Sequence, residues 1–206
     1  VAFGKYLARN KIIKEIPFSL EGVKKPKLEP LEWFSETDIE NIIRLAKRTD
    51  KALFEFLAFT GLRISEACRL SWADIDFTTG FLHVVSTSDN PTKNGKSRMV
   101  PMHNRVLNIL NNMENKSGLI FRSAKSKKYP NADGPLKDRR ALTRLKKICD
   151  KLGIEGCLHS CRKFFCSYMA NSGVPATTLI KWSGHSDLKV LMDHYYKLDN
   201  SNRSEE

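Results

Sequence analysis

The stretch from Cys157 to Lys197 reads CLHSCRKFFCSYMANSGVPATTLIKWSGHSDLKVLMDHYYK, and its apolar spacing predicts three consecutive helices. Gly173 ends the first helix, and the second runs from Pro175 to Gly184. Asp187 caps the third. The side chains that we expect to face the core are Phe164, Phe165, Tyr168, Met169, Leu179, Ile180, Leu188, Leu191 and Met192.

The same stretch carries a set of reactive polar groups. His159 and Arg162 are three residues apart near a predicted helix N-terminus, where free backbone amides favour an anion. His185 lies in a Gly-His-Ser turn, and Tyr195 and Tyr196 lie on the last helix. Together they supply phosphate-binding cations, proton carriers and an ionisable hydroxyl, which are the parts that a phosphodiester-cleaving site requires.

Composition places the chain among basic globular proteins. It has 206 residues, of which 41% are hydrophobic, so it can bury a core of about one domain. Lys and Arg outnumber Asp and Glu by 35 to 23, which gives a formal charge of +12. This charge indicates a polyanionic partner, and nucleic acid is favoured over a membrane because no apolar run approaches the ~18 residues that span a bilayer.

The five cysteines are odd in number and form no CxxC pair. A disulfide framework is therefore not expected, and a reducing, cytoplasmic compartment is the natural inference. Cys157, His159 and Cys161 are close in sequence, but their spacing matches no tetrahedral metal site. We predict no metal.

The first part of the chain predicts two domains joined by a linker. Residues 1–20 carry a short apolar helix pattern that Pro17 ends, and we interpret it as the remnant of an N-terminal domain. Residues 21–34 include the basic stretch GVKKPKLEP with its two prolines, and we interpret them as a basic linker. The main domain, residues 35–206, begins at a capping box formed by Ser35 and Asp38, followed by a helix with an apolar face.

A second, apolar helix from Ala52 to Thr60 ends at Gly61, and the sequence Gly61-Leu62-Arg63-Ile64-Ser65-Glu66 follows. Such a turn could aim the planar, permanently charged fork of Arg63 at a phosphate. A structural ion pair of Arg63 with Glu66 is the equally weighted alternative.

Residues 80–102 predict a β-hairpin, because β-branched and aromatic residues flank an Asn94-Gly95 pair. Lys93 then lies directly before a tight turn and Lys96 directly after it. A lysine at a hairpin tip is usually a solvated charge. A hairpin that folds over DNA could instead deliver an ammonium to a leaving oxygen.

A basic segment from Arg122 to Asn131 precedes a helix, about Pro135 to Leu152, with an apolar inner and a cationic outer face. Such a face is commonly only solvated, but its charge density favours contact with a phosphate backbone. The residues that we expect to bind DNA are Lys125, Lys127, Lys128, Arg139, Arg140, Arg144 and Lys147.

From about Ser35 to Leu198 the chain resembles the tyrosine site-specific recombinases, also called phage integrases. GLRISE is similar to the family's first Arg box and TKNGKSRMVP to its β-hairpin Lys segment. LHSCR is similar to its His-x-x-Arg box, and WSGHSDLKVLMDHYYK to its Gly-His-Ser segment and nucleophilic Tyr. One such motif is weak evidence, whereas four in the family's order are specific. The resemblance implies the family's catalytic-domain fold, mainly α with a small antiparallel β element.

The resemblance also implies a role for each residue. Arg63 and Arg162 would bind the non-bridging oxygens of the scissile phosphate, supported by His159 and His185. Lys93 would protonate the departing 5′-oxygen. A tyrosine would form a 3′-phosphotyrosyl bond, without a metal or any other cofactor.

The family usually places its tyrosine nine or ten residues after the Gly-His-Ser histidine, so we assign Tyr195, with Tyr196 as the alternative. Two positions depart from the family pattern, since Cys161 and Lys163 flank Arg162 where Leu and His are frequent.

Double-stranded DNA is the expected partner, in a tetramer on paired sites, while this chain alone is expected to be a monomer. A catalytically idle DNA-binding relative and a type IB topoisomerase-like enzyme are the alternatives.

Overall fold

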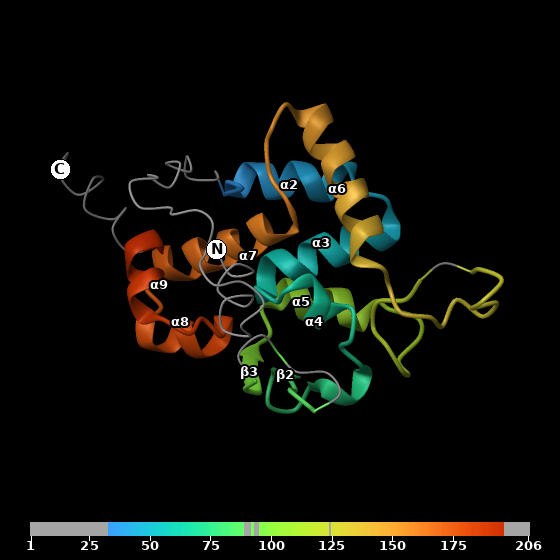
Figure 1. The fold of residues 1–206 in the computed structure, drawn as a ribbon, viewed down its shortest axis with the longest axis horizontal. Coiled ribbons are helices and arrows are strands. Elements are labelled where there is room, and N and C mark those ends of the chain that lie inside the picture. The colour runs from blue at the N-terminus through green and yellow to red at the C-terminus, as the bar shows by residue number, and fades with distance from the viewer. Residues whose placement is uncertain (1–32, 89–91, 93–94, 124, 196–206) are drawn as a thin grey trace, which may run out of the picture. The chain divides into compact units, whose positions relative to one another are not determined.

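A computed structural model describes residues 33–88, 92, 95–123 and 125–195. For residues 48, 190 and 193–195 it describes the backbone only. The predictions for residues 1–32, for Lys93 and for Tyr196 lie outside the described residues. Element labels follow Figure 1.

The first described helices, α2 (Glu36–Leu45) and α3 (Arg48–Thr60), pack against each other. Ser35 caps α2 as predicted: its hydroxyl accepts from the Asp38 amide at 3.1 Å, and its own amide donates to the Asp38 carboxylate at 2.9 Å. This capping box satisfies amides that a helix start leaves free. The apolar face of α2, made by Ile39, Ile42 and Ile43, is buried as expected.

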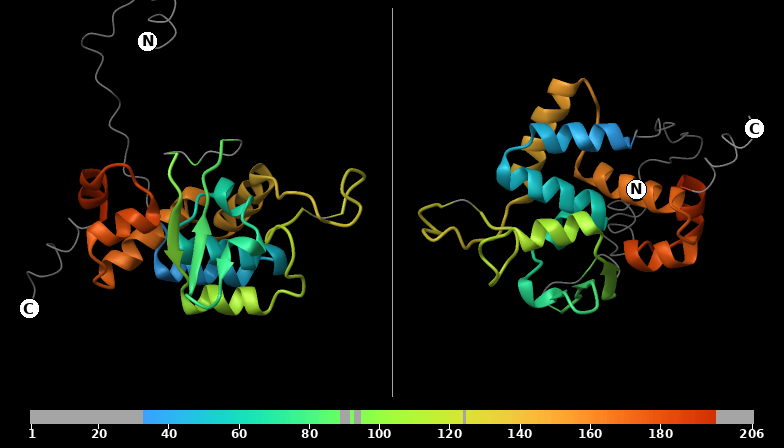
Figure 2. Two further views of the ribbon diagram at one scale, coloured as in Figure 1. Left: turned by 90° about the horizontal axis from the view of Figure 1, so that it is seen from below. Right: turned by 180° about the vertical axis from the view of Figure 1, so that it is seen from behind.

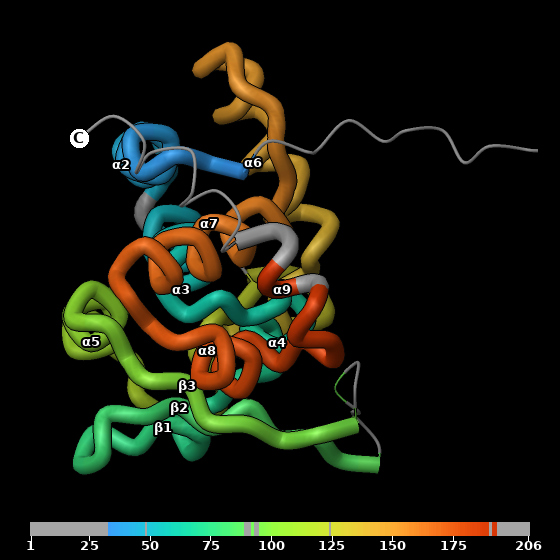
Figure 3. Tube along the Cα trace, turned by 90° about the vertical axis from the view of Figure 1, so that its left-hand side faces the viewer, coloured from blue at the N-terminus to red at the C-terminus, as the bar shows by residue number. Residues whose placement is uncertain are grey.

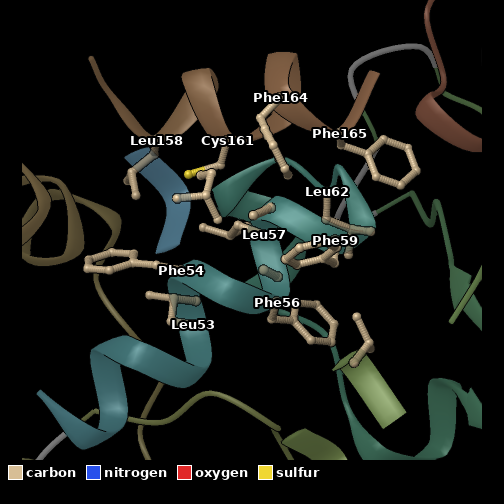
Figure 4. Close-up of a cluster of buried hydrophobic side chains, with 14 of the residues drawn as sticks. Leu53, Phe54, Phe56, Leu57, Phe59, Leu62, Leu158, Cys161, Phe164 and Phe165 are labelled. Atoms are coloured by element: carbon tan, nitrogen blue, oxygen red, sulfur yellow. The ribbon is translucent and has the colours of Figure 1, made fainter. Parts of the chain in front are cut away.

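Helix α3 is the centre of the core and packs against α2, α5 (Asn104–Asn111) and α7 (Leu158–Asn171). Figure 4 shows its apolar side chains between α7 and the rest of the domain. Gly61 ends α3 with φ +63°, and a Cβ at this position would lie 2.3 Å from the Phe165 ring. Glycine is therefore required here both by the left-handed backbone and by the close approach of α7.

A short α4 (Ile64–Ala67) and a 3-10 turn, η1 (Trp72–Asp74), lead into a three-stranded antiparallel sheet. Its strands are β1 (Ile75–Asp76), β2 (Phe81–Val84) and β3 (Arg98–Pro101), in the order β1-β2-β3. Figure 2 shows β2 and β3 side by side. The two longer strands were expected from the sequence, whereas the two-residue β1 was not.

The predicted tight turn at Asn94-Gly95 lies partly outside the described residues, because Asn94 is not described, and within them the Gly95 amide donates to the Thr92 carbonyl at 2.9 Å. The ladder pairs Leu82 with Val100 and Val84 with Arg98, so this register is not that of a two-residue connection between β2 and β3. A two-residue turn at 94–95 would require Val84 to pair with Arg105, which lies in α5. Burial of Leu82, Val84 and Val100 on one face fixes the observed register instead.

The remaining helices are α6 (Asp138–Leu152), α7, α8 (Ala176–Ser183) and α9 (Leu188–Tyr195). Gly153 and Gly184 end α6 and α8 in the left-handed conformation. The prediction for α9 is partly wrong, since Leu191 is buried but Leu188 and Met192 are 39% and 42% exposed. Among the described elements only α7 and α8 make substantial contact with α9, so they cover only a narrow stripe of the α9 surface. The fold class, mainly α with a small antiparallel sheet, is confirmed.

Candidate active site

Arg63 and Glu66 form the first part of the site, at the start of α4. The Arg63 amide donates to Glu66 Oε2 at 2.8 Å, and its Nη1 lies 3.0 Å from Oε1. The ion pair considered from the sequence is therefore present. Arg63 also donates from Nη2 to the Gly184 carbonyl at 3.4 Å, and its side chain keeps 21% of its surface exposed. It remains accessible to a further anion.

Arg162 lies beneath this pair with only 1% of its surface exposed. Its Nη1 donates to the Gly61 carbonyl at 2.7 Å, and its Nη2 donates to the Ser183 carbonyl. Burial, then the charge of Arg63, lowers the pKa of the guanidinium to about 10, so it stays charged near neutral pH. Its Nε is buried and has no hydrogen-bond partner among the residues described.

The two histidines of the site differ in exposure. His185 follows the left-handed Gly184, and its Nδ1 lies 2.8 Å from the Ser183 hydroxyl. Burial, then the charges of Arg162 and Arg63, lowers the pKa of His185 to about 4, so it is neutral near pH 7. His159 is exposed at the start of α7, and its charge also lowers the pKa of His185. The structure thus brings Arg63, His159, Arg162 and His185 together.

Arg98 belongs to the same cluster and was missed by the sequence analysis. Its Nη1 and Nη2 donate to Glu66 at 2.9 and 2.7 Å, and its Nε donates to the Trp182 carbonyl at 2.8 Å. The sequence held one signal, because Arg98 alternates with Val100 and Met102 and so faces the core. Burial raises the pKa of Glu66, but the hydrogen bonds and charges of Arg98 and Arg63 outweigh this and lower it to about 2.

Lys93 and the tyrosines are not tested by the geometry. Lys93 and Tyr196 lie outside the described residues, and of Tyr195 only the backbone is described, at the end of α9.

Of the two departures from the family pattern, Cys161 is fully buried, and burial raises the pKa of its thiol to about 12. It fills the core in place of an apolar residue. Lys163 is half-buried on α7.

The segment between α5 and α6 extends away from the helices (Figures 1 and 2). Its ends are held by pairing of Arg122 with Pro135, and the Tyr129 ring packs against Gly134, where a Cβ would lie 2.4 Å away. Three of the predicted DNA-binding residues are exposed on it, namely Lys125, Lys127 and Lys128. The segment is a structured cationic projection.

Helix α6 carries the other four predicted DNA-binding residues. Arg139, Arg140 and Lys147 are exposed. Arg144 differs, because its Nε lies 2.7 Å from Asp50 Oδ1, a buried carboxylate of α3. Part of its charge is therefore offset within the protein. With Lys137 and Thr143, the arginines 139, 140 and 144 line an open depression near the start of α6.

In the described part of the chain, no group of three or more His, Cys, Asp or Glu side chains is arranged to hold a metal ion. All five cysteines are described, and all are free thiols. No helix among the described residues is long and apolar enough to cross a membrane.

Residues 32–202 match the sequence pattern of the phage integrase family. The chain belongs to this family. Its relatives include a tyrosine recombinase XerC of Xanthomonas campestris pv. campestris, 30% identical over 142 residues, which are 68% of this chain and 41% of that protein. A tyrosine recombinase XerA of Pyrococcus horikoshii is 28% identical over 176 residues, 83% of this chain and 58% of that protein.

The fold agrees with the family as well. The Tn1549 transposon integrase in complex with a circular intermediate DNA superimposes with a TM-score of 0.70 at 19% identity, covering 93% of this chain and 70% of that one. The predicted catalytic-domain fold is confirmed. The chain spans about two fifths of the length of the XerC relative, so it corresponds to part of such a protein.

Proposed function

We propose that this chain is the catalytic part of a site-specific DNA recombinase, which cleaves and rejoins DNA strands through a covalent 3′-phosphotyrosyl intermediate. The observation that carries the proposal is the convergence of Arg63, Arg162 and His185, which lie in three segments far apart in sequence, on the turn at Gly184. Fixed cations at one turn are what a phosphorane transition state requires.

The two arginines have different parts in this proposal. Arg63 is accessible and binds a non-bridging oxygen of the scissile phosphate. Arg162 is covered, so a phosphate oxygen reaches its unpartnered Nε only if neighbouring atoms move. Without such a movement, Arg162 contributes its positive charge to the site and donates hydrogen bonds to the Gly61 and Ser183 carbonyls.

The chemistry is a transesterification. The Tyr195 phenolate oxygen forms a bond to phosphorus while the bond to the 5′-oxygen breaks, and Lys93 gives a proton to that oxygen. A phenol of pKa about 10 is mostly neutral near pH 7, so it must lose its proton to a base in the site. His159 and His185 support the arginines, and neutral His185 adds no positive charge.

Covalent trapping tests the proposal. A pool of nicked duplexes with randomised sequence around the nick supplies the unknown target, and EDTA is present throughout. The wild-type chain should form an adduct that resists SDS, and sequencing of the trapped DNA should identify the site. Tyr195→Phe should abolish the adduct, and Tyr196→Phe should retain it.

Each other outcome has a distinct meaning. Loss of the adduct only in Tyr196→Phe would reassign the nucleophile, and trapping by both variants would exclude both tyrosines. DNA binding without any wild-type adduct would indicate an idle relative. Relaxation of supercoiled plasmids of any sequence would indicate a topoisomerase-like enzyme.

Binding and assembly belong to the same proposal. The residues on the α5–α6 segment and on α6 contact double-stranded DNA, and residues 1–20 and 21–34 are the end of a second DNA-binding domain and its linker. The chain acts in the cytoplasm as a tetramer on paired sites and is a monomer without DNA. Sedimentation with and without the recovered duplex checks the assembly, and a stable tetramer without DNA would contradict it.

A further inference from the structure

Arg98 occupies an unusual position in the sheet. It opens β3 on the face where its partner Val84 and the neighbours Leu82 and Val100 are buried, while Met99 on the opposite face is 45% exposed. The Arg98 side chain is itself only 8% exposed. A cation on an apolar strand face is costly unless it is fully paired, so its contacts identify what it does.

The guanidinium of Arg98 joins three elements. Its two terminal nitrogens donate hydrogen bonds to the two carboxylate oxygens of Glu66, at the end of α4, at 2.9 and 2.7 Å. Its Nε donates to the carbonyl of Trp182 in α8 at 2.8 Å. Figure 3 shows α8 lying against β3. A bidentate pair fixes direction as well as distance, which a lysine cannot do.

Glu66 passes this constraint to Arg63. The carboxylate that Arg98 holds also accepts from the backbone amide and from Nη1 of Arg63, at 2.8 and 3.0 Å. Two cations therefore share one buried anion, and the group keeps a net positive charge. The Arg63 fork cannot turn without disturbing the pair of Glu66 with Arg98.

The stem of Arg98 also packs on the turn that carries His185. A Cβ at Gly184, where φ is +66°, would lie 3.0 Å from Arg98 Cδ and 3.1 Å from its Nε. The carbonyl of Gly184 accepts from Arg63. Arg98 and Arg63 thus bind the carbonyls of Trp182 and Gly184, both in the segment that leads to His185.

We propose that Arg98 is a positioning residue for strand cleavage: it fixes Arg63 and the Gly184–His185 turn in one arrangement and does not itself contact DNA. The inference rests on the proposed function. It also makes the β2–β3 pair a structural part of the active site, because β3 carries Arg98.

The test compares Arg98→Lys and Arg98→Gln with Arg105→Gln. Arg105 is a matched control, because it also pairs with two carboxylates, Glu40 and Glu55, but on α5, outside the cluster. The readouts are the melting temperature, the affinity for the trapped DNA sequence and the single-turnover rate of adduct formation. The rate is measured below the lowest melting temperature.

Both Arg98 variants should lose about 10²-fold in the rate, the size expected for a displaced catalytic group, with DNA affinity unchanged. Arg98→Lys decides between geometry and charge, since it keeps the cation but not the fork. Arg105→Gln should lower the melting temperature and leave the rate as in the wild type.

Nitrogen-detected titration of the histidines checks the placement without DNA. Burial lowers the pKa of both His185 and His103, and the charge of Arg98 lowers the first further while that of Arg105 lowers the second. Arg98→Gln should therefore raise the pKa of His185 and leave that of His103 unchanged, and Arg105→Gln should do the reverse.

Two results would overturn the inference. One is a full rate in Arg98→Lys, and the other is a loss of DNA affinity that accounts for the lost rate. The last would mean that Arg98 contacts DNA. Absence of any adduct with the wild-type chain would instead overturn the proposed function, and the positioning role with it.

Discussion

Arg162 donates a 2.7 Å hydrogen bond to the carbonyl of Gly61, across 101 residues of sequence. The bond is possible because Gly61 lets α7 approach the end of α3 until the Phe165 ring occupies the space of a side chain. The close approach of α7 to the end of α3 therefore both packs the core and places the Arg162 guanidinium in the site.

Gly61→Ala should destabilise the protein by about 3 kcal/mol, because it adds the cost of a left-handed alanine to that of overpacking against Phe165. Gly153→Ala is the matched control, with φ +67° and nothing within 4 Å of its Cβ. It should cost about 1 kcal/mol. Urea unfolding measures both, and equal losses would show that the Phe165 contact has no part in the effect.

Glu66→Gln should flatten the acid dependence of stability. The pKa of Glu66 falls from 4.5 to about 2 on folding, so its stabilisation is present above pH 4.5 and is lost as pH falls towards 2. The shift corresponds to on the order of 3 kcal/mol. Urea unfolding over this pH range should show a smaller slope in the variant than in the wild type.

The control for this measurement is Glu114→Gln, an exposed glutamate. It should keep the wild-type slope. If Glu66→Gln kept the wild-type slope, the ion pairs of Glu66 with Arg63 and Arg98 would not contribute to the acid dependence of stability.

Replacement of Lys125, Lys127 and Lys128 by Ala should reduce the salt dependence of DNA binding. Each lost phosphate contact lowers the slope of log K against log salt by about 0.9, so the triple variant should lose about 2.7. A duplex of mixed sequence suffices, because these contacts do not read bases. Lys47, Lys51 and Lys116, which are exposed and not assigned to DNA, provide a triple control. An equal loss in the control would indicate general charge, not a defined contact.

Replacement of Arg144 should reduce mainly the stability of the fold, whereas replacement of Arg140 should reduce mainly DNA binding. Arg144→Ala leaves the buried Asp50 carboxylate without its cation and should cost about 1–3 kcal/mol of stability. Arg140→Ala, at an exposed position, should stay within about 0.5 kcal/mol of the wild type but lower the salt slope by about 0.9. Equal stabilities would show that the Arg144–Asp50 pair contributes little.

Much of the fold could be predicted from local patterns. The capping box at Ser35, the end of α3 at Gly61 and the helix from Pro175 to Gly184 each depend on residues close in sequence. The register of β2 with β3 could not, because it is set by burial of Leu82 and Val100 against elements distant in sequence. The exposure of Leu188 and Met192 depends on which elements reach α9, and apolar spacing does not contain that information.

For the site, motifs identified Arg63, His159, Arg162 and His185, which the structure brings together. They did not predict that Arg162 is buried or that Arg144 is paired, since both depend on partners distant in sequence, Gly61 and Asp50. Arg98 was missed because its partner Glu66 had been assigned to Arg63 alone. A carboxylate can serve two arginines, and only the fold shows when it does.

The long separation of Arg162 from Gly61 has a consequence during synthesis of the chain. A ribosome that has made residues up to the end of β3 has already joined Arg63, Glu66 and Arg98 to the chain, but the helix that supplies Arg162 does not yet exist. An incomplete chain can therefore carry a cationic surface without a cleavage site. Under the proposed function, the capacity to break DNA arises only when the last helices dock, so a product truncated before them lacks the cleavage site.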